Sequence, residues 1–142
     1  MIRLIKGMYI MEKPQKFHAR NVLSISFAHF IHDVYSFFLS PILPLLIEKF
    51  SISYFSASLL DFARRFPSIL NPFIGMYISR YRIKYFVIFT PALTCTSMSL
   101  IGMAPSYSVL LILLLISGIS VSLFHVPAPV MVARLAGPRK GR

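Results

Sequence analysis

Four long apolar stretches, separated by short polar segments, constrain this chain more than any other feature of its sequence. They cover residues 21–46, 57–78, 85–103 and 108–133. A helix of about 20 apolar residues spans the hydrocarbon core of a bilayer, and a segment in lipid must satisfy its own backbone hydrogen bonds. The sequence therefore predicts an all-α integral membrane protein with four transmembrane helices.

The composition agrees with a membrane protein and argues against an ordinary soluble domain. Of the 142 residues, 56% are hydrophobic and only 13% are charged, whereas soluble domains average about 25% charged. The net charge of +11 would suggest nucleic-acid binding in a soluble protein, but in a membrane protein the placement of the basic residues matters more. We therefore expect the lipid bilayer as a partner, and no nucleic acid.

Lysine and arginine alternate between the polar segments. The tail at residues 1–20 contains five, the three loops contain one, three and none, and the C-terminal end contains four. Cytoplasmic segments are enriched in these residues, so the pattern predicts a multi-pass protein of the plasma membrane with both termini in the cytoplasm. Residues 1–20 are then a basic cytoplasmic tail and residues 21–142 the membrane part. A cleaved signal peptide is not expected, because the first apolar stretch is too long.

Ionisable side chains interrupt two of these stretches. In HFIHD, residues 29–33, His29 and Asp33 share a helix face, whereas His32 points about 100° away from Asp33. An ionisable group is unfavourable in lipid, so it is expected to face the bundle interior or a water-filled cavity. His125 lies in the fourth stretch, directly before VPAP. Asp33, His29, His32 and His125 are therefore the candidate proton-coupling or substrate-cavity residues.

Other interpretations of HFIHD stay open. His29 and Asp33 could be a structural pair that fixes helix packing. Metal binding by His29, His32 and Asp33 is a weaker alternative, because His32 lies on another face, so neither a metal nor another cofactor is predicted. An intramembrane enzyme is not expected either, since no nucleophile or oxyanion-stabilising set accompanies these residues.

The second stretch contains DFARR, residues 61–65. Asp61 precedes Arg64 by three residues and Arg65 by four, so a helix allows at least one ion pair. A guanidinium group within the membrane can line a cavity and bind a carboxylate or phosphate. Asp61, Arg64 and Arg65 are therefore candidates for a gate or an anion-binding site, with a structural salt bridge as the alternative.

Three segments of the sequence resemble transporters of the major facilitator superfamily, in particular the fosmidomycin-resistance-like drug exporters. LSISFAHFIHDVYSFFLSPILPLLIEKF resembles their first helix, FARRFPSILNPFIG their second, and SLFHVPAPVMVARLAGPRKGR the end of their fourth helix and the following loop. The resemblance covers residues 20–142.

The superfamily signature between helices two and three reads approximately G-x-x-x-D-R-x-G-R-[RK]. Here the corresponding segment is GMYISRYRIK, in which Gly75, Arg80 and Lys84 match. Ser79 replaces the acidic residue, so the gating role that the family gives this cytoplasmic loop is in doubt here.

The resemblance implies a fold of twelve helices in two halves, with helices one and four lining a central cavity. It also implies export of a small-molecule drug in exchange for protons, driven by the proton gradient. With about four of the twelve helices, the chain is expected to be an N-terminal fragment that transports only when the missing segments complete it. Import of a sugar, metabolite or anion is an alternative substrate class. A different alternative is a small self-standing membrane protein that forms a homo-oligomer or binds a partner through Gly118.

Overall fold

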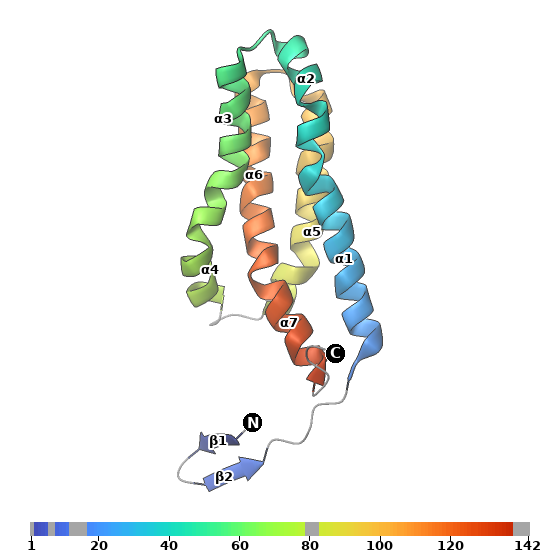
Figure 1. Cartoon of the computed structure of the whole chain (residues 1–142), viewed down its shortest axis with the longest axis vertical. Coiled ribbons are helices and arrows are strands. Elements are labelled where there is room, and N and C mark those ends of the chain that lie inside the picture. The colour runs from blue at the N-terminus through green and yellow to red at the C-terminus, as the bar shows by residue number, and fades with distance from the viewer. Residues whose placement is uncertain (1, 6–7, 12–16, 79–82, 138–142) are drawn as a thin grey trace.

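The computed structural model describes residues 2–5, 8–11, 17–78 and 83–137. Four helical rods stand side by side and run alternately up and down (Figure 1). The first rod consists of α1 (Ala19–Phe37) and α2 (Leu39–Phe50), the second of α3 (Tyr54–Arg65), the 3-10 helix η1 (Phe66–Leu70) and α4 (Asn71–Ile78), the third of α5 (Ile83–Leu100) with η2 (Ile101–Met103), and the fourth of α6 (Tyr107–His125) and α7 (Pro127–Leu135).

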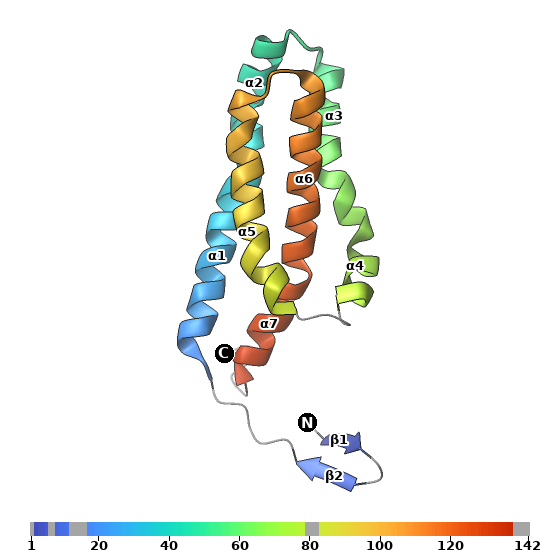
Figure 2. The same cartoon turned by 180° about the vertical axis from the view of Figure 1, so that it is seen from behind.

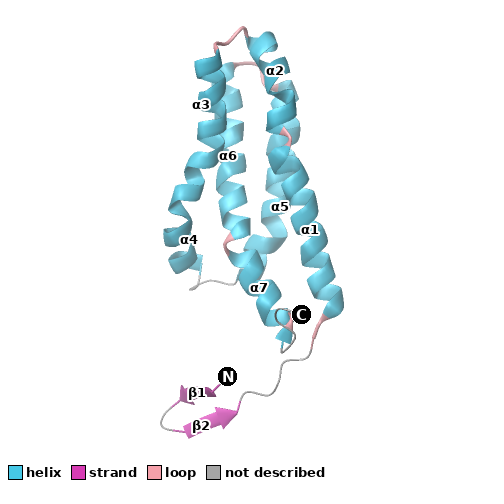
Figure 3. Ribbon diagram, viewed as in Figure 1, coloured by secondary structure: helices cyan, strands magenta, loops and turns pink. Residues whose placement is uncertain are grey.

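The predicted all-α membrane fold is confirmed for the rods, where every element is helical (Figure 3). The sequence did not predict the short antiparallel hairpin that precedes them, formed by β1 (Ile2–Ile5) and β2 (Met8–Met11). Ile2 pairs with Met11 and Ile5 with Met8. The tail at residues 1–20 therefore contains regular structure of its own.

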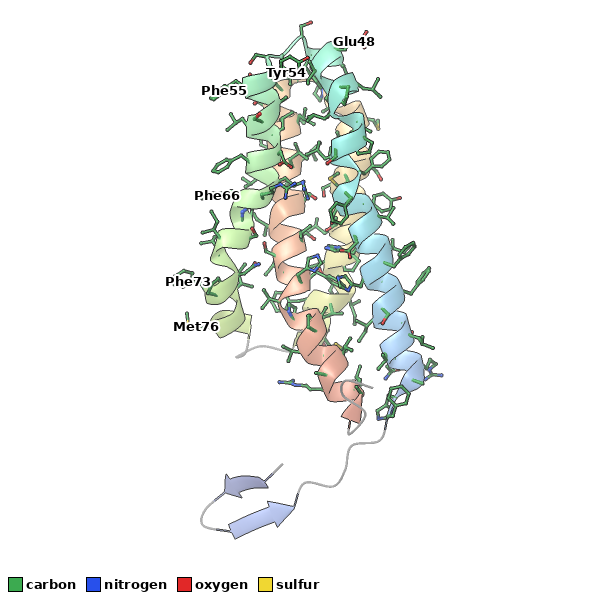
Figure 4. The ribbon with its side chains drawn as sticks, in the orientation of Figure 1. Glu48, Tyr54, Phe55, Phe66, Phe73 and Met76 are labelled. Carbon is green, nitrogen blue, oxygen red and sulfur yellow. The ribbon has the colours of Figure 1, made fainter. Side chains whose placement is uncertain are left out.

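Within the described residues, three helical segments are long and apolar enough to cross a bilayer, namely Ala19–Phe50, Lys84–Met103 and Tyr107–Leu135. The second rod is not among them, because its helix is interrupted at η1 and carries the charged residues of DFARR. Its outer side is nevertheless apolar: Phe55, Phe66 and Phe73 point away from the bundle (Figure 4) and are 78%, 46% and 63% exposed. Such a face suits lipid contact, so a membrane span at 57–78 stays a prediction.

Prolines explain where the rods break. Proline has no backbone N–H, so it leaves the carbonyl four residues earlier without its helical hydrogen bond. Pro41 leaves the carbonyl of Phe37, the last residue of α1, and Pro129 leaves that of His125, the last residue of α6. Pro67 starts η1. Pro91, in contrast, lies inside an uninterrupted α5.

The fourth rod lies at the centre, since α6 contacts α1, α3, α4 and α5 (Figure 2). Polar side chains join it to α5 inside the bundle. The Thr94 hydroxyl donates to the Ser120 hydroxyl at 2.8 Å, and Ser120 donates to the carbonyl of Thr90 at 2.7 Å. Because lipid offers no competing partners, such bonds between helices each contribute about 0.6–2 kcal/mol.

Gly118 sets the closest approach between α6 and the second rod. A Cβ atom at this position would lie 2.1 Å from the Arg64 carbonyl oxygen and 3.1 Å from Cγ of Pro67. Small residues allow helix backbones to pack this closely in membranes. The sequence allows partner binding through Gly118 as an alternative, but the structure buries Gly118 within the bundle. Gly118 therefore serves internal packing, which removes the specific surface expected for oligomerisation.

Hydrogen bonds at both ends of the bundle fix the connections. The Ser53 and Ser106 side chains cap the N-termini of α3 and α6. At the same end, Lys49 Nζ donates to the carbonyls of Gly102 and Ala104 at 2.8 and 3.3 Å. At the opposite end, the N–H of His18 donates to the carbonyl of Leu135 at 3.1 Å, so the first rod starts beside the end of the fourth.

Replacing Gly118 with alanine is expected to destabilise the bundle, because the added methyl group must push α6 away from the backbone of Arg64. Overpacking of this kind costs about 1–3 kcal/mol. Thermal unfolding of the purified chain in mild detergent measures the effect. Gly102→Ala is the matched control, since no atom lies within 4 Å of its added Cβ. Equal melting temperatures for the two variants would contradict the close contact at Gly118.

Candidate functional site

Three ionisable side chains from the first and fourth rods meet between α1 and the end of α6. Asp33 lies between two histidines: its Oδ2 is 3.4 Å from His29 Nε2, and its Oδ1 is 3.4 Å from His125 Nε2. His29 Nε2 is also 3.3 Å from His125 Nδ1. We call His29, Asp33 and His125 the triad. The potential ligand atoms of the triad all lie within 4.8 Å of one another.

Helix geometry explains how the triad forms. His29 and Asp33 are one turn apart on α1, which places both on the side that faces α6. His125 is the last residue of α6, where the helix breaks ahead of Pro129. The three side chains are 41%, 38% and 36% exposed, so the triad is accessible from outside the protein chain. The Phe124 ring lies 5.4 Å from the His29 ring and provides apolar surface next to the triad.

His32 is not part of the triad, in agreement with its predicted direction on the helix. Its side chain is fully buried, with its ring 4.4 Å from that of Phe124 and 5.3 Å from that of His125. Neither ring nitrogen has a hydrogen-bond partner among the residues that the structure describes. A buried polar group without a partner costs about 1–3 kcal/mol, so packing alone does not account for a histidine here.

A polar stripe continues from the triad along the inner side of the first rod. Ser36 is buried, and its hydroxyl donates to the carbonyl of His32 at 2.8 Å. Ser40, on α2, lines a cavity of about 300 Å³ between α2 and α3, together with Ser58 and Asp61. The first rod therefore carries polar groups from His29 to Ser40 on the side where the triad and this cavity lie.

Asp61 joins both arginines of DFARR. Its Oδ2 accepts a hydrogen bond from Arg65 Nε at 2.7 Å, and its Oδ1 lies 3.5 Å from Arg64 Nη2. Arg64 is the inner arginine, with 10% of its side chain exposed, and Arg65 is the outer one with 63%. Arg64 Nε is buried without a partner in the described part of the chain. One carboxylate thus faces two guanidinium groups, and the cluster keeps a net positive charge beside the cavity.

A larger pocket lies elsewhere, on the side of the first rod that faces α5. It has a volume of about 640 Å³ and an almost entirely apolar lining that includes Val34, Phe38, Leu45 and Met98. Lys49 and Tyr35 also line it. None of the triad lines this pocket, so it offers mainly hydrophobic contact, with the Lys49 amine and the Tyr35 hydroxyl as its ionisable groups.

The residues of the loop motif are not brought together with the other candidates. Gly75 lies on α4, where an added Cβ would make only ordinary contact with Val126, at 3.5 Å. Lys84 is exposed, with Nζ 5.1 Å from the centre of the Tyr85 ring. Arg80 lies outside the described residues. A gating role for this motif stays a prediction.

Comparison with known proteins identifies the family. The sequence pattern of the Major Facilitator Superfamily matches residues 25–142, which include most of the first rod and the other three. The chain belongs to the major facilitator superfamily. The resemblance seen in the sequence is therefore confirmed, and the chain is a multi-pass membrane protein of a transporter family.

One curated relative carries a more specific name. The fosmidomycin resistance protein of Escherichia coli strain K12 is 27% identical over 120 residues, which cover 83% of this chain and 29% of the relative. The chain thus spans less than a third of the length of that protein. No solved structure matches the chain.

The sequence singled out every member of the triad, but it did not predict that His125 would join HFIHD. These residues are 96 positions apart, so no local periodicity links them. The family resemblance supplied the available signal, since it places the first and fourth helices at one cavity.

Asp61→Asn is expected to lower the free energy of unfolding by about 1–2 kcal/mol, because it leaves the half-buried Arg64 without a counter-charge. Thermal or denaturant unfolding of the purified chain in detergent measures this change. Glu48→Gln removes an exposed carboxylate and is the matched control, expected to stay within about 0.5 kcal/mol of the unsubstituted chain. An unchanged stability of the Asp61 variant would show that the arginines do not need the carboxylate.

Proposed function

We propose that this chain forms the first part of the transport domain of a proton-coupled exporter of small molecules. The observation that carries the proposal is the triad: in a chain of the major facilitator superfamily, Asp33 and two histidines meet between the first and fourth rods. A carboxylate beside imidazoles can take up and release protons near neutral pH. The name of the E. coli relative supports a drug as the exported molecule.

In this proposal the triad carries the proton and the neighbouring polar surface meets the substrate. Asp33 holds the proton, while His29 and His125 share it and keep the carboxylate in place. The His32 ring packs against the Phe124 ring, so a movement of α6 would also move His32. The stripe that ends at Ser40 leads from the triad to the cavity beside Asp61.

The cluster of Asp61, Arg64 and Arg65 favours a substrate with an anionic group. Two guanidinium groups share one carboxylate, so one positive charge is left over for a ligand. Guanidinium groups bind carboxylates and phosphates with two parallel hydrogen bonds. The same positive charge would also bind an anionic metabolite in an importer. Measuring the direction of transport distinguishes this function from export.

Alternating access in this family moves one helical half against the other around a central site. We therefore propose that this chain transports only together with further helices, whether on the same polypeptide or on another. Its membrane is the plasma membrane, with residues 1–20 and the end of α7 in the cytoplasm, as the placement of Lys and Arg favours.

Cysteine labelling tests this orientation in the chain itself. Cys95 is first replaced by serine, and Tyr54→Cys or His18→Cys then marks one end of the bundle each; both positions are exposed. A membrane-impermeant maleimide is expected to label the Tyr54 variant in intact cells and the His18 variant only after permeabilisation. The reverse pattern would overturn the cytoplasmic placement of the termini.

A chimaera tests proton-coupled export. The aligned 120-residue region of the E. coli relative is replaced by that of this chain, and resistance to fosmidomycin and drug-dependent proton movement in membrane vesicles are measured. Asp33→Asn is expected to abolish both, because the amide does not take up a proton in this pH range. Glu48→Gln is the control.

Two results of the chimaera experiment contradict the proposal in different ways. Resistance that survives Asp33→Asn would exclude Asp33 as the proton carrier. A chimaera that inserts in the membrane but confers no resistance would argue against this drug class. In that case, proton movement driven by anionic metabolites tests the import alternative.

A further inference from the structure

The contacts within the triad are slightly longer than typical hydrogen bonds. Hydrogen bonds from nitrogen to oxygen are normally 2.7–3.2 Å long. Both contacts of Asp33 with histidine nitrogens measure 3.4 Å, and the contact between His29 and His125 measures 3.3 Å. Each pair lies just beyond a good hydrogen bond, although α1 and α6 hold all three side chains at one place.

The triad also brings three potential ligands of one metal ion close together. Zinc binds histidine nitrogen and carboxylate oxygen at about 2.0–2.2 Å, so two ligands in a tetrahedral arrangement lie about 3.4 Å apart. The measured distances of 3.3 and 3.4 Å are close to this edge length, although they involve both carboxylate oxygens of Asp33 and both ring nitrogens of His125. A further requirement is that one atom from each residue can point to a common centre, and such atoms lie within 4.8 Å of one another.

The donor set defines the class of ion. Two imidazoles and one carboxylate suit divalent zinc, cobalt, nickel or iron, whereas calcium and magnesium prefer ligand sets made of oxygen. Three protein ligands leave at least one coordination position open, as in metal sites that bind a further molecule. The partial exposure of all three side chains gives an ion and such a molecule access.

The surroundings also favour a bound cation. Asp33 is the only carboxylate of the triad, and a carboxylate within an apolar bundle is unfavourable unless an opposite charge accompanies it. Neutral histidines supply no such charge, whereas a divalent ion neutralises the carboxylate and leaves a charge of +1 on the site. The Phe124 ring lies 5.4 Å from the His29 ring and 5.8 Å from the His125 ring, and such apolar surroundings strengthen this attraction.

We propose that His29, Asp33 and His125 form a binding site for one divalent first-row transition-metal ion. The ion bridges α1 and α6 and therefore ties the first rod to the fourth. The open coordination position accepts water or an anionic group of a small molecule. Protons compete with the ion for the same three groups. The inference does not rest on proton-coupled export, because metal binding is measured on the chain alone.

Cobalt titration of the purified 142-residue chain in detergent, prepared without a histidine tag, tests the site. Visible absorption is expected to rise until one Co²⁺ is bound per chain, and the melting temperature to rise with Co²⁺ and fall again with a chelator. Asp33→Asn and His125→Gln are each expected to raise the Kd at least about tenfold. His18→Gln and Cys95→Ser are the controls, because both residues lie outside the triad, and their Kd is expected to be unchanged.

Three results would overturn the proposal. The first is the absence of binding up to about 1 mM Co²⁺, which corresponds to an affinity too weak for a built site. The second is an unchanged Kd in the Asp33 and His125 variants. Circular dichroism shows whether these variants fold. If they do not, X-ray absorption of Zn²⁺ bound to the unsubstituted chain identifies the ligand atoms directly. Two imidazoles and at least one oxygen at about 2.0–2.2 Å are expected, and a sulfur ligand or a shell of oxygen alone is the third contradicting result.

Discussion

The close approach of α6 to the second rod is the contact on which the rest of the bundle depends. Gly118 allows the backbone of α6 to reach the carbonyl of Arg64, and the opposite side of α6 bonds to α5 through Ser120. Because α6 contacts every other rod, its position also sets where His125 stands relative to α1. The position of α6 therefore affects two groups of side chains. These are the triad and the cluster of Asp61, Arg64 and Arg65 on the second rod.

This arrangement makes the site sensitive to small movements. His125 lies at the break between α6 and α7, so a change in the angle at that break moves its ring relative to Asp33. His32 packs against both Phe124 and His125 and would follow the same movement. Under the proposals made above, proton or metal binding at the triad would favour the geometry in which the three groups stay together, and thereby one angle at the break.

The sequence predicted the helical membrane fold, the family and the members of the candidate site. Runs of apolar residues predicted the fold, and the spacing of HFIHD placed His29 and Asp33 on one helix face, because both are local properties of helices. The family came from the resemblance of three segments to known transporters, and His125 from its place in the fourth apolar stretch. The prolines alone do not determine where a helix ends: Pro91 leaves α5 continuous, whereas Pro41 lies just after the end of α1. The internal role of Gly118 and the meeting of Asp33 with His125 depend on how rods pack, which periodicity within one rod does not encode.

The separation of 96 residues between His29 and His125 has a consequence for biosynthesis. A membrane protein enters the bilayer from its N-terminus as the ribosome extends it, at about 5–20 residues per second. The first rod is therefore in place several seconds before the fourth has been made, with His29 as the only triad partner of Asp33. During this interval the Asp33 carboxylate must be stabilised by contact with the insertion machinery, by hydration or by protonation. Completion of the fourth rod brings His125 to Asp33, so translation that slows between the two rods would prolong the time that Asp33 spends without this partner.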